Sequence, residues 1–87
     1  MMQLKATKTS LYLLVRDATG IEMPKPRDTV FYKTPRTPSY WLRWYGVECY
    51  LTATLGKALL AVKADGERKV YRISIDDLKA RGMVEEH

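Results

Sequence analysis

Apolar and polar residues alternate most clearly between residues 58 and 73, on either side of the dipeptide Asp65-Gly66. Asp-Gly favours a two-residue type I′ turn, in which both central residues have positive φ. Such a turn pairs residues at equal distances from it, namely Ala64 with Glu67, Val62 with Lys69, Leu60 with Tyr71 and Ala58 with Ile73. The apolar members from Ala58 to Val62, with Tyr71 and Ile73, then share one face. The other face carries Lys63 directly across from Arg68, with Arg72 farther along, so the pattern predicts a β-hairpin that packs on a core.

The middle of the chain fits two structures. As strands, residues 40–45 and 49–54 flank a turn at Gly46, and a second turn follows at Leu55-Gly56-Lys57. As a helix capped by Ser39, the chain from there on would align apolar residues at spacings of three and four: Trp44, Val47, Leu51, Leu55, Ala58 and Val62. Gly46 and Gly56 each cost a helix roughly 1 kcal/mol relative to Ala. We therefore expect strands. The alternative is an α+β domain in which a helix over residues 39–55 packs on the hairpin of residues 58–74.

The N-terminal part predicts strands and proline-rich loops. Residues 4–16 contain a β-favouring run at positions 11–15, which ends at the turn signal Asp17-Ala18-Thr19-Gly20. All four prolines of the chain follow, at positions 24, 26, 35 and 38, and they exclude a long helix or a central strand there. Between the two proline pairs, residues 29–32 predict a short strand. Residues 34–39 then form an exposed loop.

The C-terminal segment predicts a short helix. Ser74 can cap it, and Asp76 and Asp77 lie in its first turn, where the helix dipole favours anions. Gly82 suits the left-handed position that ends a helix. Met83 and Val84 can fold back onto the core, and residues 85–87 are expected to fray.

These elements predict one domain over residues 1–84, in which residues 24–39 are proline-rich and partly loop. The fold class is mainly β (a β-rich α+β domain). We expect a small, strongly bent antiparallel sheet or a partly open SH3-like barrel, with a short C-terminal helix. Such an architecture by itself says little about function.

Charge is distributed unevenly along the 87 residues. The chain has 15 Lys and Arg against 10 Asp and Glu, a net charge of +5. Residues 1–43 hold eight basic and three acidic residues, whereas residues 44–87 hold seven of each. A bias of this kind suits phosphate backbones or an acidic protein surface, although surplus cations also simply keep a small domain in solution.

The composition argues against an enzyme. The single cysteine, Cys49, is expected to be a buried apolar residue, and the single histidine, His87, lies at the end of the chain. Neither a disulfide nor a Cys/His metal site can form within one chain from this set. The adjacent Asp76 and Asp77 are explained by a helix start, and the glycines are too scattered for a phosphate-binding loop. We therefore expect no cofactor and no metal.

The expected compartment is the cytoplasm. A lone cysteine is typical of a reducing environment. The longest apolar runs, residues 11–15 and 58–62, are far shorter than the roughly 20 residues of a membrane span, and no signal peptide is apparent. A domain this small with many aromatic residues could also pair with itself.

A cluster of aromatic and basic residues near the middle of the chain is the remaining candidate site. In a strand, Trp41, Arg43 and Tyr45 point to one side and stay partly accessible. Tyr40, Leu42 and Trp44 point to the other side. Exposed rings beside cations suit single-stranded nucleic acid, because bases stack on rings while cations neutralise phosphates. The same residue types dominate protein-binding hot spots, and they can also simply cover the second face of a sheet.

The leading hypothesis is a non-enzymatic nucleic-acid-binding module. In it Trp41 and Tyr45 stack on bases, and six cations contact phosphates: Lys33, Arg36, Arg43, Lys63, Arg68 and Arg72. The alternative is a protein–protein adaptor or inhibitor that docks the same basic, aromatic surface on an acidic protein. The sequence predicts no membrane partner.

Overall fold

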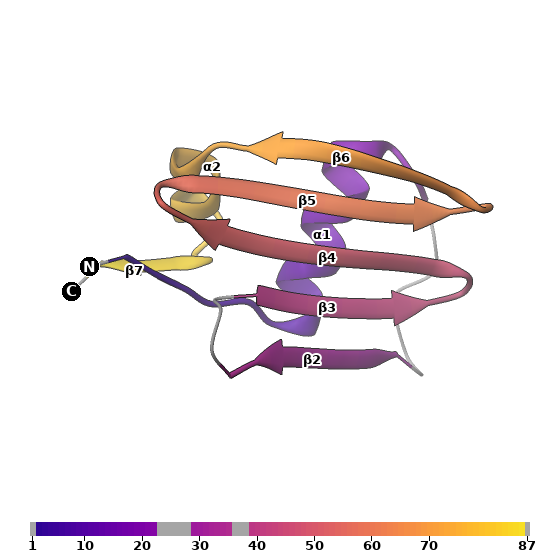
Figure 1. Ribbon diagram of the computed structural model, residues 1–87, viewed down its shortest axis with the longest axis horizontal. Helices are drawn as coiled ribbons and strands as arrows, with labels where there is room; N and C mark the ends of the chain where they lie inside the picture. Colours follow the sequence, from indigo (N-terminus) through magenta and orange to yellow (C-terminus); the bar gives the residue numbers. More distant parts are fainter. Residues whose placement is uncertain (1, 23–28, 36–38, 87) are drawn as a thin grey trace.

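The computed structural model, described here for residues 2–22, 29–35 and 39–86, is a five-stranded antiparallel sheet with one long helix across one face (Figure 1). The sheet is a meander whose strands follow one another in chain order: β2 (Val30–Thr34), β3 (Ser39–Trp44), β4 (Val47–Thr54), β5 (Lys57–Ala64) and β6 (Glu67–Ile73). The helices are α1 (Lys8–Thr19) and α2 (Ile75–Ala80), and β1 (Met2–Leu4) pairs with β7 (Val84–Glu86). The predicted mainly β fold is confirmed. The sheet is open and is not closed into a barrel.

Three two-residue turns set the register of the last four strands. Each turn ends in glycine, at Tyr45-Gly46, Leu55-Gly56 and Asp65-Gly66, and both residues of each have positive φ, as a type I′ turn requires. The Asp65-Gly66 hairpin has the predicted register throughout. Buried and more exposed residues alternate along β3 and β4, which is the two-residue period of strands. The alternative helix over residues 39–55 is therefore wrong.

The strand predicted within residues 4–16 is also wrong, because most of this segment forms α1. Thr7 caps the helix: its side chain accepts a hydrogen bond from the Ser10 N–H at 3.0 Å, and Ser10 accepts one from the Thr7 N–H at 2.8 Å. Leu11, Leu14 and Val15 recur at helical spacing and bury one stripe against the sheet. The predicted turn at residues 17–20 is the end of this helix, where Gly20 adopts a left-handed conformation with φ 74°.

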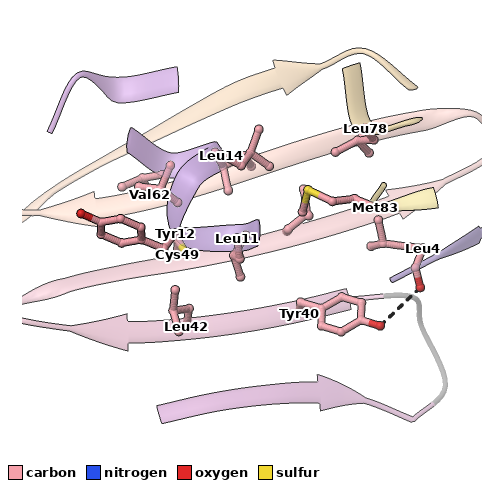
Figure 2. Close-up of a cluster of buried hydrophobic side chains, with 14 of the residues drawn as sticks. Leu4, Leu11, Tyr12, Leu14, Tyr40, Leu42, Cys49, Val62, Leu78 and Met83 are labelled. Atoms are coloured by element: carbon pink, nitrogen blue, oxygen red, sulfur yellow. Dashed lines mark hydrogen bonds between the residues drawn. The ribbon is translucent and has the colours of Figure 1, made fainter. Parts of the chain in front are cut away.

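The core lies between α1 and the inner face of the sheet, the face that α1 covers (Figure 2). One leucine from each of β3, β4 and β5 is almost completely buried: Leu42, Leu51 and Leu60. They lie in the same core as Leu11 and Leu14 of the helix, which are equally buried. Tyr40 joins this core to the N-terminal strand, because its hydroxyl donates to the Leu4 carbonyl at 3.4 Å. Burying a leucine stabilises the fold by about 1.5–3 kcal/mol. Because α1 covers this face, the candidate site lies on the opposite face of the sheet.

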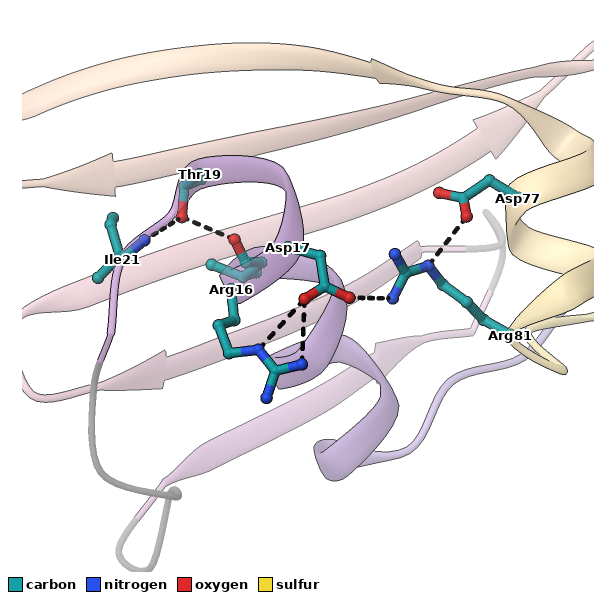
Figure 3. Close-up of polar contacts among 7 residues, drawn as sticks. Arg16, Asp17, Thr19, Ile21, Asp77 and Arg81 are labelled. Carbon is teal, nitrogen blue, oxygen red and sulfur yellow. Dashed lines mark hydrogen bonds and ion pairs between the residues drawn. The ribbon is translucent and has the colours of Figure 1, made fainter.

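The C-terminal helix forms as predicted. Ser74 caps it by accepting the Asp77 N–H at 3.0 Å, Gly82 has φ 72°, and Met83 is buried. Arg81 then ties α2 to α1, because it donates to Asp77 at 3.2 Å and to Asp17 at 2.9 Å (Figure 3).

The expected fraying of residues 85–87 is wrong for residues 85 and 86. These residues lie in β7, which pairs with β1, and the Lys5 ammonium contacts the Glu85 carboxylate at 2.7 Å. His87 lies outside the described residues. Half of the predicted proline-rich segment of residues 24–39 does too, namely residues 24–28 and 36–38. Within the described ranges, no helix is long and apolar enough to cross a membrane.

Candidate nucleic-acid interface

The face of the sheet turned away from α1, called the outer face below, carries three rows of side chains. Each row crosses all five strands, because the register aligns alternate residues of neighbouring strands. The aromatic row is Tyr32, Trp41, Tyr50, Ala61 and Val70. The charged row is Val30, Arg43, Glu48, Lys63 and Arg68. The third row is Thr34, Ser39, Thr52, Leu59 and Arg72. The helix α1 lies against the opposite face of the sheet and does not cover these rows (Figure 1).

The aromatic row begins with a stack of rings at the β2 edge. The Tyr32 and Trp41 rings lie nearly parallel, with 5.4 Å between their centroids and 15° between their planes. The Arg43 guanidinium carbon lies 5.4 Å from the centroid of the same Trp41 ring. Trp41 therefore already has two partners, whereas Tyr32 is 59% exposed and Tyr50 is 37% exposed. The ring surfaces that remain open to a ligand belong mainly to the two tyrosines.

The charged row places one carboxylate between two cations and a third cation at its β6 end. Glu48 is paired in the register with Arg43 on one side and Lys63 on the other, and its carboxylate lies 4.0 Å from the Arg43 guanidinium. Arg68 stands at the β6 edge directly opposite Lys63. Like charges that face each other across strands destabilise a sheet. An anion bound over Lys63 and Arg68 would reduce this repulsion and so stabilise the sheet.

Among the described residues, the excess positive charge lies on the outer face. By register its described residues include five cations, Arg43, Lys57, Lys63, Arg68 and Arg72, and one carboxylate, Glu48. Five against one leaves +4 on this face. The described residues elsewhere hold seven Lys and Arg and eight Asp and Glu, so the positive charge of the described part of the chain is concentrated beside the exposed rings.

A hollow of about 180 Å³ lies between the aromatic and charged rows. Its lining includes Trp41, Glu48, Tyr50, Ala61, Lys63 and Arg68. Ala61 stands between Tyr50 and Val70 in the aromatic row, and its small side chain leaves the row open at that point. The hollow is thus bounded by rings on one side and by charged groups on the other.

The structure brings five of the eight predicted site residues onto the outer face: Trp41, Arg43, Lys63, Arg68 and Arg72. Lys33 has the opposite parity in β2, and its ammonium lies 6.0 Å from the Tyr40 ring centroid on the inner side. Tyr45 is exposed, but it lies in the turn after β3, with φ 43°, rather than in the strand as expected, so it is not part of the aromatic row. Arg36 lies outside the described residues.

Sequence reasoning missed four outer-face residues, Tyr32, Glu48, Tyr50 and Lys57. The signal that locates the three of them in β4 and β5 is the set of X-Gly turns. Two-residue turns at positions 45–46 and 55–56 fix Tyr50 as the partner of both Trp41 and Ala61. Adding the registers of successive hairpins therefore yields the part of each row that crosses β3 to β6, whereas Tyr32 joins the aromatic row through the pairing of β2 with β3, which no X-Gly turn sets.

Two observations concern metal binding and the single thiol of the described residues. No three His, Cys, Asp or Glu side chains among them lie close enough to hold a metal ion. Cys49 is buried, and burial raises the pKa of its thiol to about 12, so it is protonated at neutral pH.

No family model, curated protein or solved structure matches the chain. The proposal for its function therefore rests on the chemistry of the outer face.

Proposed function

We propose that the protein is a non-enzymatic module that binds single-stranded nucleic acid across the outer face of its sheet. The observation that carries the proposal is the adjacency of the aromatic row, with Tyr32 and Tyr50 exposed, and the cationic residues of the charged row. Base stacking on an aromatic side chain contributes about 1–3 kcal/mol per base, and a cationic groove follows the backbone. A four-stranded sheet with exposed rings is one established way of binding RNA.

The spacing of the rows fits one strand rather than a duplex. Neighbouring outward-pointing residues on one strand are about 6.6–6.8 Å apart, and neighbouring strands are about 4.8 Å apart. A nucleic-acid strand that runs perpendicular to the β-strands can therefore lay bases on the aromatic row and phosphates on the charged row. A duplex hides the faces of its bases, so it would use the cations and leave the rings without a role.

Docking on an acidic protein would use the same surface, so the test measures the binding of nucleic acid itself and the part that the aromatic row plays in it. We expect Tyr32→Ala to weaken binding of a fluorescently labelled ten-nucleotide single strand by about 5- to 150-fold, which corresponds to one lost stacking contact. Tyr45→Ala is the matched control, because Tyr45 is 57% exposed, close to the 59% of Tyr32, but lies in a turn rather than in the row. Its affinity should equal that of the unsubstituted protein.

Fluorescence anisotropy at about 50 mM salt measures both variants, and circular dichroism verifies that each is folded. The proposal is refuted if the unsubstituted protein does not bind single strands under these conditions, where phosphate contacts are strong. Equal losses for both variants would show that the aromatic row is not the binding surface.

A further inference from the structure

We propose that the hollow between the two rows is a guanine-selective base pocket in which Glu48 reads the Watson–Crick edge. The inference rests on the proposed binding of single-stranded nucleic acid and adds to it the base that the face prefers. It is carried by the shape of the hollow and by the kinds of hydrogen-bonding groups on its rim.

The hollow has the dimensions and walls of a site for one base. Its volume is about 180 Å³, well above the roughly 10–15 Å³ that one water molecule needs, so it has room for a larger group. Tyr50 provides a partly exposed ring at one wall, and Ala61 provides a small apolar floor. A flat heterocycle can therefore rest beside the Tyr50 ring with its polar edge turned toward the charged row.

The charged row offers a defined set of hydrogen-bonding groups to that edge. The Glu48 carboxylate only accepts hydrogen bonds and has two oxygens, whereas Lys63 and Arg68 only donate. Guanine presents two adjacent donors, N1–H and the N2 amino group, next to one acceptor, O6. The two donors match the carboxylate, and O6 matches either cation.

The other bases complement this set less well. Adenine and cytosine each place an amino donor next to a ring nitrogen that accepts, and that nitrogen would face a carboxylate oxygen. Uracil and thymine carry a single N–H between two carbonyl groups. Only guanine supplies two neighbouring donors, and single-stranded bases expose this edge for recognition.

Glu48 works against phosphate binding on this surface. It is a negative charge between two cations of the charged row, where it opposes an anionic backbone. Its pair with Arg43 is long, at 4.0 Å, and solvent-exposed, so the pair adds little stability. Recognition of a base with two donors gives the carboxylate a role at this position.

The test compares four nine-nucleotide DNA strands, thymidine throughout except for a central guanine, adenine, cytosine or thymine. We expect the guanine strand to bind about 5- to 150-fold more tightly than the other three, the range that corresponds to one bidentate pair. Glu48→Gln replaces one acceptor with a donor, so it should reduce this preference to less than about twofold. Because it also removes a negative charge, affinity for the all-thymidine strand should stay the same or rise.

Glu67→Gln is the matched control, since it makes the same change of charge on β6 but points to the inner side of the sheet, paired with Ala64. It should keep the guanine preference. Failure of every strand to bind overturns the proposed function and this inference together. Binding without a guanine preference overturns the base pocket alone, and a preference that survives in Glu48→Gln removes Glu48 from it.

Discussion

Replacing Arg68 with glutamine should weaken nucleic-acid binding and stabilise the folded protein at the same time. Arg68 stands at the β6 edge of the charged row, and Lys63 is its only neighbour in that row. Removing one of two like charges that face each other across strands stabilises a sheet by roughly 0.2–1 kcal/mol. The opposite signs matter, because a loss of affinity in a more stable protein cannot result from unfolding.

The size of the binding effect follows from the number of cations on the outer face. For single strands, the slope of the logarithm of affinity against the logarithm of salt concentration is about −0.7 for each phosphate contact. If all five outer-face cations engage, the slope is about −3.5, and affinity falls about 100-fold between about 50 and 200 mM salt. Arg68→Gln leaves four contacts and a slope of about −2.8, so affinity falls only about 50-fold over the same range.

Lys69→Gln is the control that isolates the face. Lys69 is the next residue on the same strand and also loses one positive charge, but its register partner is Val62 of the inner face. Anisotropy titrations at four salt concentrations give the slopes, and urea unfolding gives the stabilities. An unchanged slope in Arg68→Gln, or the same decrease in both variants, would refute the assignment of phosphate contacts to the outer face.

Three further predictions concern the scaffold. Leu55→Asn should raise the free energy of unfolding by about 1 kcal/mol, because Leu55 is 98% exposed and strained at φ 52°. Asp65→Asn, also at φ 52°, is the control and should change the free energy of unfolding by less than about 0.5 kcal/mol. Equal urea midpoints for Leu55→Asn and the unsubstituted protein would contradict the strain argument. Cys49 should resist a disulfide-exchange reagent at pH 8 in the folded protein and react rapidly in denaturant, because burial raises its pKa to about 12; rapid labelling of the folded protein would show that the thiol is accessible. Hydrogen bonds from Arg81 and then Arg16 lower the pKa of Asp17 below its ordinary 3.8, so Asp17→Asn should be less stable at neutral pH. That deficit is complete above pH 3.8 and disappears as the pH falls through the lowered pKa, and a deficit independent of pH would exclude the ion pair as its cause.

The sequence predicts the second half of the fold better than the first, for physical reasons. Asp65-Gly66 is a turn sequence that satisfies both left-handed positions, so the register of its hairpin follows from local chemistry. Tyr45 and Leu55 occupy the same kind of position although neither residue type favours it, so the other two turns were only approximately located. The helix α1 was missed because the β propensity of its residues was given more weight than the helical spacing of its buried stripe.

The candidate site shows the same division between local and long-range information. Trp41 and Arg43 were identified because alternation within one strand places both on one side. Tyr32, Glu48 and Tyr50 join them only through pairing between strands, which depends on all of the turns. The hollow at Ala61 depends on three neighbouring strands together, so it could not be inferred from any one segment.

The central claim is that single-stranded nucleic acid binds on the outer face, and the two tryptophans test it within one NMR spectrum. Trp41 lies on the outer face, whereas Trp44 is buried on the inner face beside Tyr12, with 5.7 Å between the ring centroids. We expect the indole N–H signal of Trp41 to shift progressively as a mixed-sequence single strand is added at about 50 mM salt, while that of Trp44 stays in place. Absence of any shift at saturating concentrations, or a shift confined to Trp44, would contradict the account.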